Sequence, residues 1–332
     1  MAFRHCSPRA KLQSSGCAAL VLVACAALAA GCGLRSASGA VLDAKPGTIK
    51  HYDSLDGVPI TVAAKDFTEQ LILGNMLSTI LNAAGAKVTN LTNTPGSFGV
   101  RQALIKGTAD IVPEYTGTGW INYLGNETPV KGEQAQWEAV NKADAKNGVT
   151  WLPPAPMNNT YAFAILGSTG KKLGITKLSQ LKDLPKAELT FCVESEFAKR
   201  NDGFVPMLEA YGLNEKSVAK VTTLDTGVIY TATADRKCNF GEVFTTDGRI
   251  PGLKLSVLED DKEFFPLYNL TEVINTKVLK QHPELKEIFA QLNPLLTNEV
   301  MLDLNSKIDV DGEEPAIVAR DWLIEQSLLN KP

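Results

Sequence analysis

Two clusters of polar side chains near the start of the chain have the composition expected of a ligand site. Lys65–Gln70 follows the apolar segment Ile60–Ala64, and Glu114–Thr118 follows the segment Ala109–Val112. The first of these segments is rich in β-branched residues, which is typical of a buried parallel strand. Because open α/β sheets bind ligands beyond the carboxyl ends of their strands, we expect the two clusters to contribute to one binding site.

Residues that commonly perform catalysis are poorly represented. The three histidines are His5, His51 and His282. Few histidines are therefore available to form a Ser-His-Asp triad. No cysteine and histidine group has metal-ligand spacing, and neither a phosphate-binding loop nor a GxGxxG motif occurs. We therefore predict that the protein is not an enzyme and has no metal or cofactor. Four carboxylates are expected to cap helices or form ion pairs: Asp66, Glu69, Glu114 and Asp247.

The segments around the two clusters alternate between strand and helix patterns. Asp66 and Glu69 have capping-box spacing and predict a helix start, and Gly85 predicts its end. The apolar residues between them recur at helical spacing, so this helix should face a core. A second strand is expected at Lys87–Leu91 and a second helix at Phe98–Lys106. These elements predict a βαβαβ unit that holds both clusters at one sheet edge.

A second α/β pattern begins after a proline-rich boundary. Pro153, Pro154 and Pro156 interrupt regular structure, and strand and helix patterns then alternate over Asn158–Asp247. From Asp260 onward the pattern is mainly helical. The order of patterns alone allows either two independent domains in series or two lobes between which the chain crosses twice.

Composition indicates a soluble globular protein and excludes some partners. The chain has 332 residues, of which 44% are hydrophobic and 21% charged, so it is long enough for two domains. Its net charge is −4, although the first 31 residues carry three basic residues and no acid. The remainder is therefore acidic, which gives no reason to expect nucleic acid or anionic lipid as a partner.

The N-terminus has the features of an export signal. Arg4, Arg9 and Lys11 precede the apolar run Cys17–Ala30, which is too short to span a bilayer comfortably. The run ends in a segment, 28–32, that is similar to the lipobox of lipoprotein signals. We expect residues 1–31 to be removed, Cys32 to carry lipid and residues 32–57 to form a tether. The alternative is an ordinary secretory signal with an incidental cysteine.

The remaining cysteines suggest one disulfide bond. Cys192 and Cys238 are the two cysteines that lie beyond the signal and the lipidation site, and each lies in or beside an apolar strand-like run. An exported protein with two such cysteines is expected to join them for stability rather than for redox chemistry. The alternative is a pair of buried free thiols.

Five segments together resemble one family. Residues 65–76 (KDFTEQLILGNM) and 109–120 (ADIVPEYTGTGW) resemble signatures of the substrate-binding proteins of quaternary-amine ABC transporters, often called ProX or OpuAC. Three further matches follow in order, at residues 196–203, 244–248 and 260–268. The resemblance covers nearly the whole chain from residue 60 to residue 329.

The resemblance implies a fold and a function. The fold is α/β and two-lobed, of the type II periplasmic-binding-protein kind, with two crossings between the lobes. We expect residues 58–155 and 250–332 in lobe 1 and residues 156–249 in lobe 2. The protein would capture glycine betaine, choline or carnitine outside the cytoplasm. As a monomer held to the outer face of the membrane by its lipid, it would deliver the ligand to an ABC permease and ATPase complex.

The ligand chemistry explains the residue types that the resemblance carries over. A trimethylammonium group donates no hydrogen bond, so aromatic faces bind it best, and a ligand carboxylate needs Lys, Arg, hydroxyl or backbone donors. Phe244 stands where relatives commonly have tyrosine, which removes one hydroxyl from the site. The implied cage walls are Tyr115, Tyr161, Phe244 and Tyr268, and the implied carboxylate partners are Lys65, Thr118 and Arg200.

Two other functions remain open at this stage. The same fold could bind a different small molecule, such as an aromatic compound or a polyol, and the missing tyrosine hydroxyl at position 244 makes this conceivable. Alternatively, the protein could be a surface sensor or scaffold without a role in transport.

Overall fold

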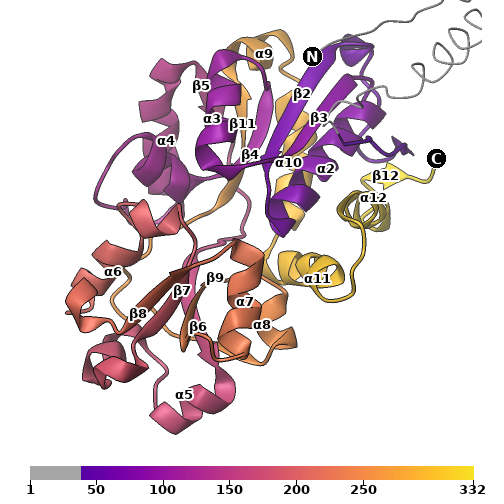
Figure 1. Cartoon of the computed structure of the whole chain (residues 1–332). Helices are drawn as coiled ribbons and strands as arrows, with labels where there is room; N and C mark the ends of the chain where they lie inside the picture. Colours follow the sequence, from indigo (N-terminus) through magenta and orange to yellow (C-terminus); the bar gives the residue numbers. More distant parts are fainter. Residues whose placement is uncertain (1–38) are drawn as a thin grey trace, which may run out of the picture. The chain divides into compact units, whose positions relative to one another are not determined.

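The chain forms two five-stranded sheets, each with its own helices and hydrophobic core (Figure 1). The computed structural model of the protein describes residues 39–332. The predicted signal segment and the lipidation site Cys32 lie outside the described residues. The α/β, two-lobed fold with two crossings is confirmed.

The first sheet belongs to lobe 1 and has the strand order β3-β2-β4-β11-β5. β2 runs parallel to β3 and β4, as the βαβαβ pattern predicts, whereas β11 is antiparallel to both β4 and β5. The sheet is therefore mixed. Its strands are β2 Pro59–Lys65, β3 Lys87–Thr94, β4 Ile111–Tyr115, β5 Val149–Trp151 and β11 Leu270–Asn275.

Helices cover the first sheet and build its core. Helix α2 packs against β2, β3 and α12, and the apolar stripe that the sequence predicts is buried along its length, from Ile72 to Leu81. Gly85 follows the helix with a φ of 113°, which agrees with its predicted role at the helix end. The helices of this lobe are α2 Thr68–Ala83, α3 Gly96–Lys106, α4 Glu133–Asp144, α9 Thr276–Gln281, α10 Leu285–Leu292, α11 Asn298–Asp309 and α12 Pro315–Glu325.

The second sheet belongs to lobe 2 and has the strand order β10-β6-β9-β7-β8. Its core is rich in phenylalanine, with Phe163, Phe191 and Phe240 fully buried. The disulfide expected from the cysteine count is present between Cys192 and Cys238. The strands are β6 Tyr161–Leu166, β7 Thr190–Val193, β8 Lys220–Thr223, β9 Phe240–Phe244 and β10 Leu255–Val257, and the helices are α5 Gly167–Leu173, α6 Phe204–Ala210, α7 Thr226–Ala234 and α8 Arg249–Gly252.

The return crossing from lobe 2 to lobe 1 lies later in the chain than predicted from the sequence. The expected boundary was residue 250, yet β10 pairs with β6 of the second sheet. The backbone N–H of Leu258 also donates to the carbonyl of Phe163 in that sheet. The corrected return to lobe 1 therefore follows β10 and precedes β11. Since β10 is only three residues long, its pairing partner could not be identified from the local pattern.

Part of the expected tether is folded onto lobe 1. β1, Lys45–Pro46, pairs antiparallel with β12, Leu329–Asn330, at the end of the chain. Ile49 and Leu55 are fully buried in the core that contains α2. The expectation of a flexible segment up to residue 57 is thus wrong for residues 45–57, because two apolar side chains anchor it.

The predicted capping box at the start of α2 is also wrong. The helix begins at Thr68 with Phe67 as its N-cap residue, and no side chain caps it. Asp66 instead accepts a hydrogen bond from the backbone N–H of Gly96. Glu69 is buried and points away from the cap position into a polar cluster between the lobes.

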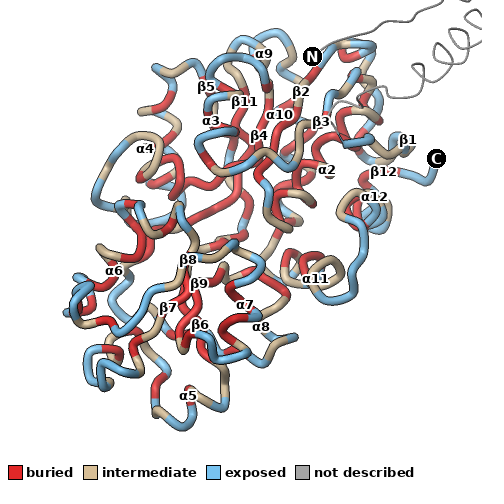
Figure 2. The backbone as a smooth tube through the Cα atoms, in the orientation of Figure 1, coloured by how far each residue is buried: buried red, intermediate tan, exposed pale blue. Residues whose placement is uncertain are grey.

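Burial is concentrated in the central strands (Figure 2). β4, β11 and β9 are almost entirely buried, whereas the edge strand β8 is mostly exposed. Tyr115 is the last residue of β4, so this strand extends beyond Val112, where the predicted strand ended. Because β4 is buried, it holds the backbone of Tyr115 in a fixed position.

Candidate ligand-binding site

A cavity of about 570 Å³ is lined by residues from both lobes. From lobe 1 it takes the carboxyl ends of β2 and β4, at Lys65 and Tyr115, and the start of α3. From lobe 2 it takes side chains of β6 and β9 and the segment Glu194–Glu196 that follows β7. Both polar clusters identified in the sequence therefore contribute to the same cavity, as the sheet-edge argument predicts.

Five aromatic side chains, which we call the aromatic lining, follow one another around this cavity. The ring centroids of Tyr161 and Phe244 are 5.2 Å apart, and those of Tyr161 and Tyr268 are 5.3 Å apart. The ring centroid of Phe67 lies 5.2 Å from that of Phe244 and 6.4 Å from that of Tyr115. Phe67 therefore bridges the rings of lobe 1 and lobe 2. The lining thus brings together residues that are as far apart in sequence as positions 67 and 268.

Strand register explains why two of these rings meet. Tyr161 on β6 lies directly opposite Phe244 on β9 in an antiparallel pair, and directly paired side chains project from the same face of a sheet. Tyr268 is held by its backbone N–H, which donates to Oδ1 of Asn158 at 2.7 Å. A Cβ atom at Gly117 would come within 2.7 Å of the Tyr268 ring, so glycine is required for this close approach.

Lys65 lines the cavity but is already engaged by a carboxylate. Its Nζ donates to Oε1 of Glu114 at 2.6 Å and lies 5.1 Å from the ring centroid of Tyr115. The other oxygen of Glu114 accepts a hydrogen bond from the Tyr123 hydroxyl at 2.5 Å. Both charged side chains are buried, so their mutual ion pair and the added hydrogen bond offset the loss of hydration.

Thr118 also lines the cavity, where it begins the π-helical turn Thr118–Tyr123. Its side chain is buried, and the turn follows β4 after two residues. No local pattern predicts this π-helical turn, a conformation that is often found at functional sites.

Arg200 is the one predicted contact residue that does not line the cavity. Its guanidinium forms two hydrogen bonds with the carboxylate of Asp202, at 2.7 and 2.8 Å, and a third with Glu196 at 3.2 Å. It lies 5.2 Å from the ring centroid of Tyr161, and the Tyr268 hydroxyl donates to the same Asp202. The structure therefore places Arg200 behind two rings of the aromatic lining.

Several lining residues were not singled out from the sequence. Phe67 lies inside the KDFTEQ segment, so this motif is the signal that could have identified it. Glu242 lies two residues before Phe244 on the same strand and hence on the same face. Strand alternation is the signal that could have identified Glu242 once Phe244 was assigned to the site.

Burial dominates the electrostatics of the cavity walls. It raises the pKa of Tyr115, Tyr161 and Tyr268 well above the usual value, so their hydroxyls remain protonated. Burial also raises the pKa of Glu242 to about 8, although the backbone N–H of Glu194 favours its ionised form. The site is therefore a cavity with aromatic walls and one carboxyl group, Glu242, whose charge depends on pH near neutrality.

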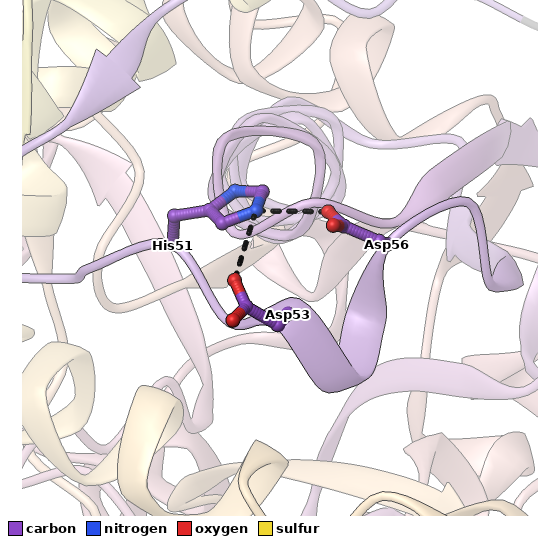
Figure 3. Close-up of side chains that lie close together, drawn as sticks. All are labelled: His51, Asp53 and Asp56. Atoms are coloured by element: carbon purple, nitrogen blue, oxygen red, sulfur yellow. Dashed lines mark ion pairs between the residues drawn. The ribbon is translucent and has the colours of Figure 1, made fainter.

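A second cluster of possible ligand atoms lies outside the cavity (Figure 3). Nε2 of His51 lies 2.8 Å from Oδ1 of Asp56 and 3.9 Å from Oδ1 of Asp53. All three residues are exposed, so the cluster has the properties of an ordinary surface ion pair. Separately, none of the helices in residues 39–332 is long and apolar enough to cross a membrane.

The comparisons with known proteins agree on one family. A family model described as the substrate-binding domain of ABC-type glycine betaine transport systems matches residues 58–325. A glycine-betaine-binding protein of Pseudomonas aeruginosa is 37% identical over 279 residues, which cover 82% of this chain and 89% of that protein. A solved structure of a glycine betaine/carnitine/choline ABC transporter protein is similar with a TM-score of 0.67 and 30% identity, covering 81% of this chain and 99% of that one.

A further relative is a longer protein. The ergothioneine transport permease/ergothioneine binding protein of Helicobacter pylori is 34% identical over 273 residues. The match covers 82% of this chain but 48% of that protein. The relatives are binding proteins of transport systems, which agrees with the prediction that this chain is not an enzyme.

Proposed function

Because the chain belongs to the family of substrate-binding domains of ABC-type glycine betaine transport systems, we propose that it captures a quaternary-amine osmoprotectant in the cavity between its lobes. The observation that carries this proposal is the aromatic lining, in which rings from distant parts of the chain surround one cavity. Glycine betaine, choline and carnitine are the candidate ligands.

The aromatic lining suits a trimethylammonium group. Ring faces attract a cation through their quadrupole while the methyl groups pack against apolar surface, and each dry contact contributes about 1–2 kcal/mol. Tyr115, Tyr161, Phe244 and Tyr268 supply these faces, and Phe67 adds a fifth that was not predicted from the sequence. Burial of Tyr115 and Tyr268 supports the proposal, because desolvation strengthens the attraction.

The polar end of the ligand is proposed to contact Lys65 and Thr118. Both line the cavity, and Lys65 keeps donors beyond the one used by Glu114. Arg200 supports the rings from behind rather than contacting the ligand directly, because Asp202 occupies its guanidinium. This revises the role that the resemblance implied for Arg200.

The protein is proposed to act outside the cytoplasm as a lipoprotein anchored through Cys32. Its lobes would close on the ligand by a hinge motion at the two crossings and then present it to an ABC permease and ATPase complex. The mature protein would act as a monomer. These steps rest on the family and on the N-terminal sequence, which has the composition of a lipoprotein signal.

Calorimetry of the purified protein with glycine betaine, choline and carnitine tests the proposal. We expect saturable binding of at least one of them with 1:1 stoichiometry. Folded protein that binds none of the three would refute this ligand class. Ergothioneine should be titrated in the same series, because a relative at 34% identity is named for binding it and it too carries a trimethylammonium group.

A further inference from the structure

Glu242 is a buried carboxyl group that the proposed cage leaves without a role. It lies on β9, is 3% exposed and lines the cavity. Its side chain is on the same face as Phe244, two residues further along the strand. One carboxyl group is therefore held directly beside an aromatic wall of the proposed cage.

The hydrogen bonds of Glu242 leave one oxygen free for a ligand. Oε2 accepts a hydrogen bond from the backbone N–H of Glu194 at 2.7 Å. Oε1 accepts none from any residue that the structure describes, and it is not sealed off from the cavity. Because this oxygen is accessible from the cavity and makes no hydrogen bond within residues 39–332, it is available to a donor group of a ligand.

The neighbouring acids are not free in the same way. The carboxylate of Glu194 accepts hydrogen bonds from the Ser195 hydroxyl and from the backbone N–H of Glu196. The carboxylate of Glu196 accepts from the backbone N–H of Ser97, from Asn122 and from Arg200. Glu242 is therefore the buried acid of the cavity lining that retains an unused oxygen among the described residues.

The charges around the cavity favour a ligand with a net positive charge. The two basic lining residues, Lys65 and Arg249, are bound by Glu114 and Asp247 at 2.6 and 2.5 Å. A ligand carboxylate would therefore have to share Lys65 with Glu114, close to additional negative charge. The acidic residues of the lining are Asp66, Glu194, Glu196, Asp225 and Glu242.

We propose that Glu242 determines specificity by accepting a hydrogen bond from an O–H or N–H group of the ligand. The cavity then selects quaternary ammonium ions that carry such a donor over ions that end in a carboxylate alone. This inference rests on the proposed function and narrows its ligand class, with choline as the simplest example. A cation bound in the aromatic lining also favours the ionised form of Glu242, which is the stronger acceptor.

Calorimetry with three matched ligands tests the inference. Choline carries a hydroxyl, tetramethylammonium has no polar end and glycine betaine ends in a carboxylate. We expect choline to bind about tenfold or more tightly than each of the others, as one hydrogen bond to a charged group allows. Tighter binding of glycine betaine than of choline would overturn the inference and leave the proposed function intact, whereas binding of none would refute both.

Two variants separate the hydrogen bond from the charge. Glu242→Leu removes the acceptor and should bring the affinity for choline down to that for tetramethylammonium. Glu242→Gln keeps an acceptor oxygen but not the charge, so both affinities should fall while choline stays preferred. An unchanged ratio of the two affinities in Glu242→Leu would overturn the inference.

Glu272 supplies a matched control. It is a buried glutamate on β11 that accepts a hydrogen bond from Asn293, and it does not line the cavity. Glu272→Gln should therefore leave the ratio of choline to tetramethylammonium affinity unchanged. Thermal unfolding of each variant verifies that it is folded, and the conservative Glu242→Gln variant keeps the test decisive if Glu242→Leu does not fold.

Discussion

The Tyr115 hydroxyl donates a hydrogen bond of 2.6 Å to Oε1 of Glu69, so a wall of the cavity is tied to a buried carboxyl group. The same oxygen accepts from Asn159 at 2.9 Å. The other oxygen accepts from the Thr246 hydroxyl at 2.5 Å and from Asn305 at 3.3 Å. Thr246 lies two residues after the lobe 2 strand β9, whereas Glu69 belongs to helix α2 of lobe 1. Glu69 therefore links both lobes to the aromatic lining.

Glu69→Gln is expected to lower the free energy of unfolding by about 2–3 kcal/mol. The side-chain amide of the new glutamine has N–H donors on one side. These would face some of the hydroxyl and amide donors that Glu69 accepts from, so those donors would lose their buried acceptor. The affinity for the ligand should fall as well, because the Tyr115 ring loses the partner that fixes its orientation. Urea denaturation measures the first effect and calorimetry the second.

Tyr115→Phe is the matched control for this cluster. It removes a single hydroxyl and keeps the ring, so we expect a loss of about 1 kcal/mol of stability. Equal stability of Glu69→Gln and the unaltered protein would contradict the assignment of Glu69 as a buried acceptor between the lobes.

Removing one ring face of the aromatic lining should weaken ligand binding without unfolding the protein. Tyr161→Leu is expected to reduce the affinity for a quaternary amine by about 5- to 30-fold, which corresponds to about 1–2 kcal/mol. Phe163→Leu on the same strand is the control, because Phe163 is buried in the lobe 2 core and does not line the cavity. Similar losses of affinity in both variants would indicate a general effect of packing instead.

The segments closest to the proposed cage were the most predictable part of the molecule. Tyr115, Tyr161, Phe244 and Tyr268 lie in short motifs, and each lies at or near the end of a strand whose apolar pattern is visible in the sequence. Local pattern and motif therefore agree at these positions. The structure places all four rings along one cavity, while their contact with a ligand remains a proposal.

Features that depend on the folded path of the chain were not predictable. Arg200 could bind a ligand or pair with Asp202, and only the folded loop shows that Asp202 and Glu196 both engage its guanidinium. β10 joins the second sheet through three residues whose pairing has no local signal. Glu69 has capping-box spacing, yet its four donors come from segments up to 236 residues away.

Loss of the disulfide should lower the free energy of unfolding and leave the affinity for the ligand unchanged. Cys192 and Cys238 are separated by 46 residues, and a loop of this length predicts a contribution of about 2–4 kcal/mol. The double variant Cys192→Ala, Cys238→Ala is therefore expected to show a lower urea midpoint with an unchanged affinity for the ligand. A change in affinity larger than about twofold would show that the bond also positions the cavity walls.

The affinity for a cationic ligand should rise with pH through the range in which Glu242 ionises. Burial raises the pKa of Glu242 to about 8, so the group is mainly neutral at pH 6 and mainly charged at pH 9. A bound cation favours the charged form, and the gain approaches about tenfold per pH unit if only that form binds. The charged groups that act on Glu242 are Glu194, Glu196 and Arg200.

Calorimetry with tetramethylammonium at pH 6, 7, 8 and 9 isolates this dependence, because the ligand itself does not titrate. In Glu242→Gln the profile should become flat, while Glu272→Gln should keep it. Glu272 is the stricter control because burial raises its pKa to about 7, so it titrates in the same range but away from the cavity. A profile that is flat in the unaltered protein, or that persists in Glu242→Gln, would mean that another group governs the charge of the site.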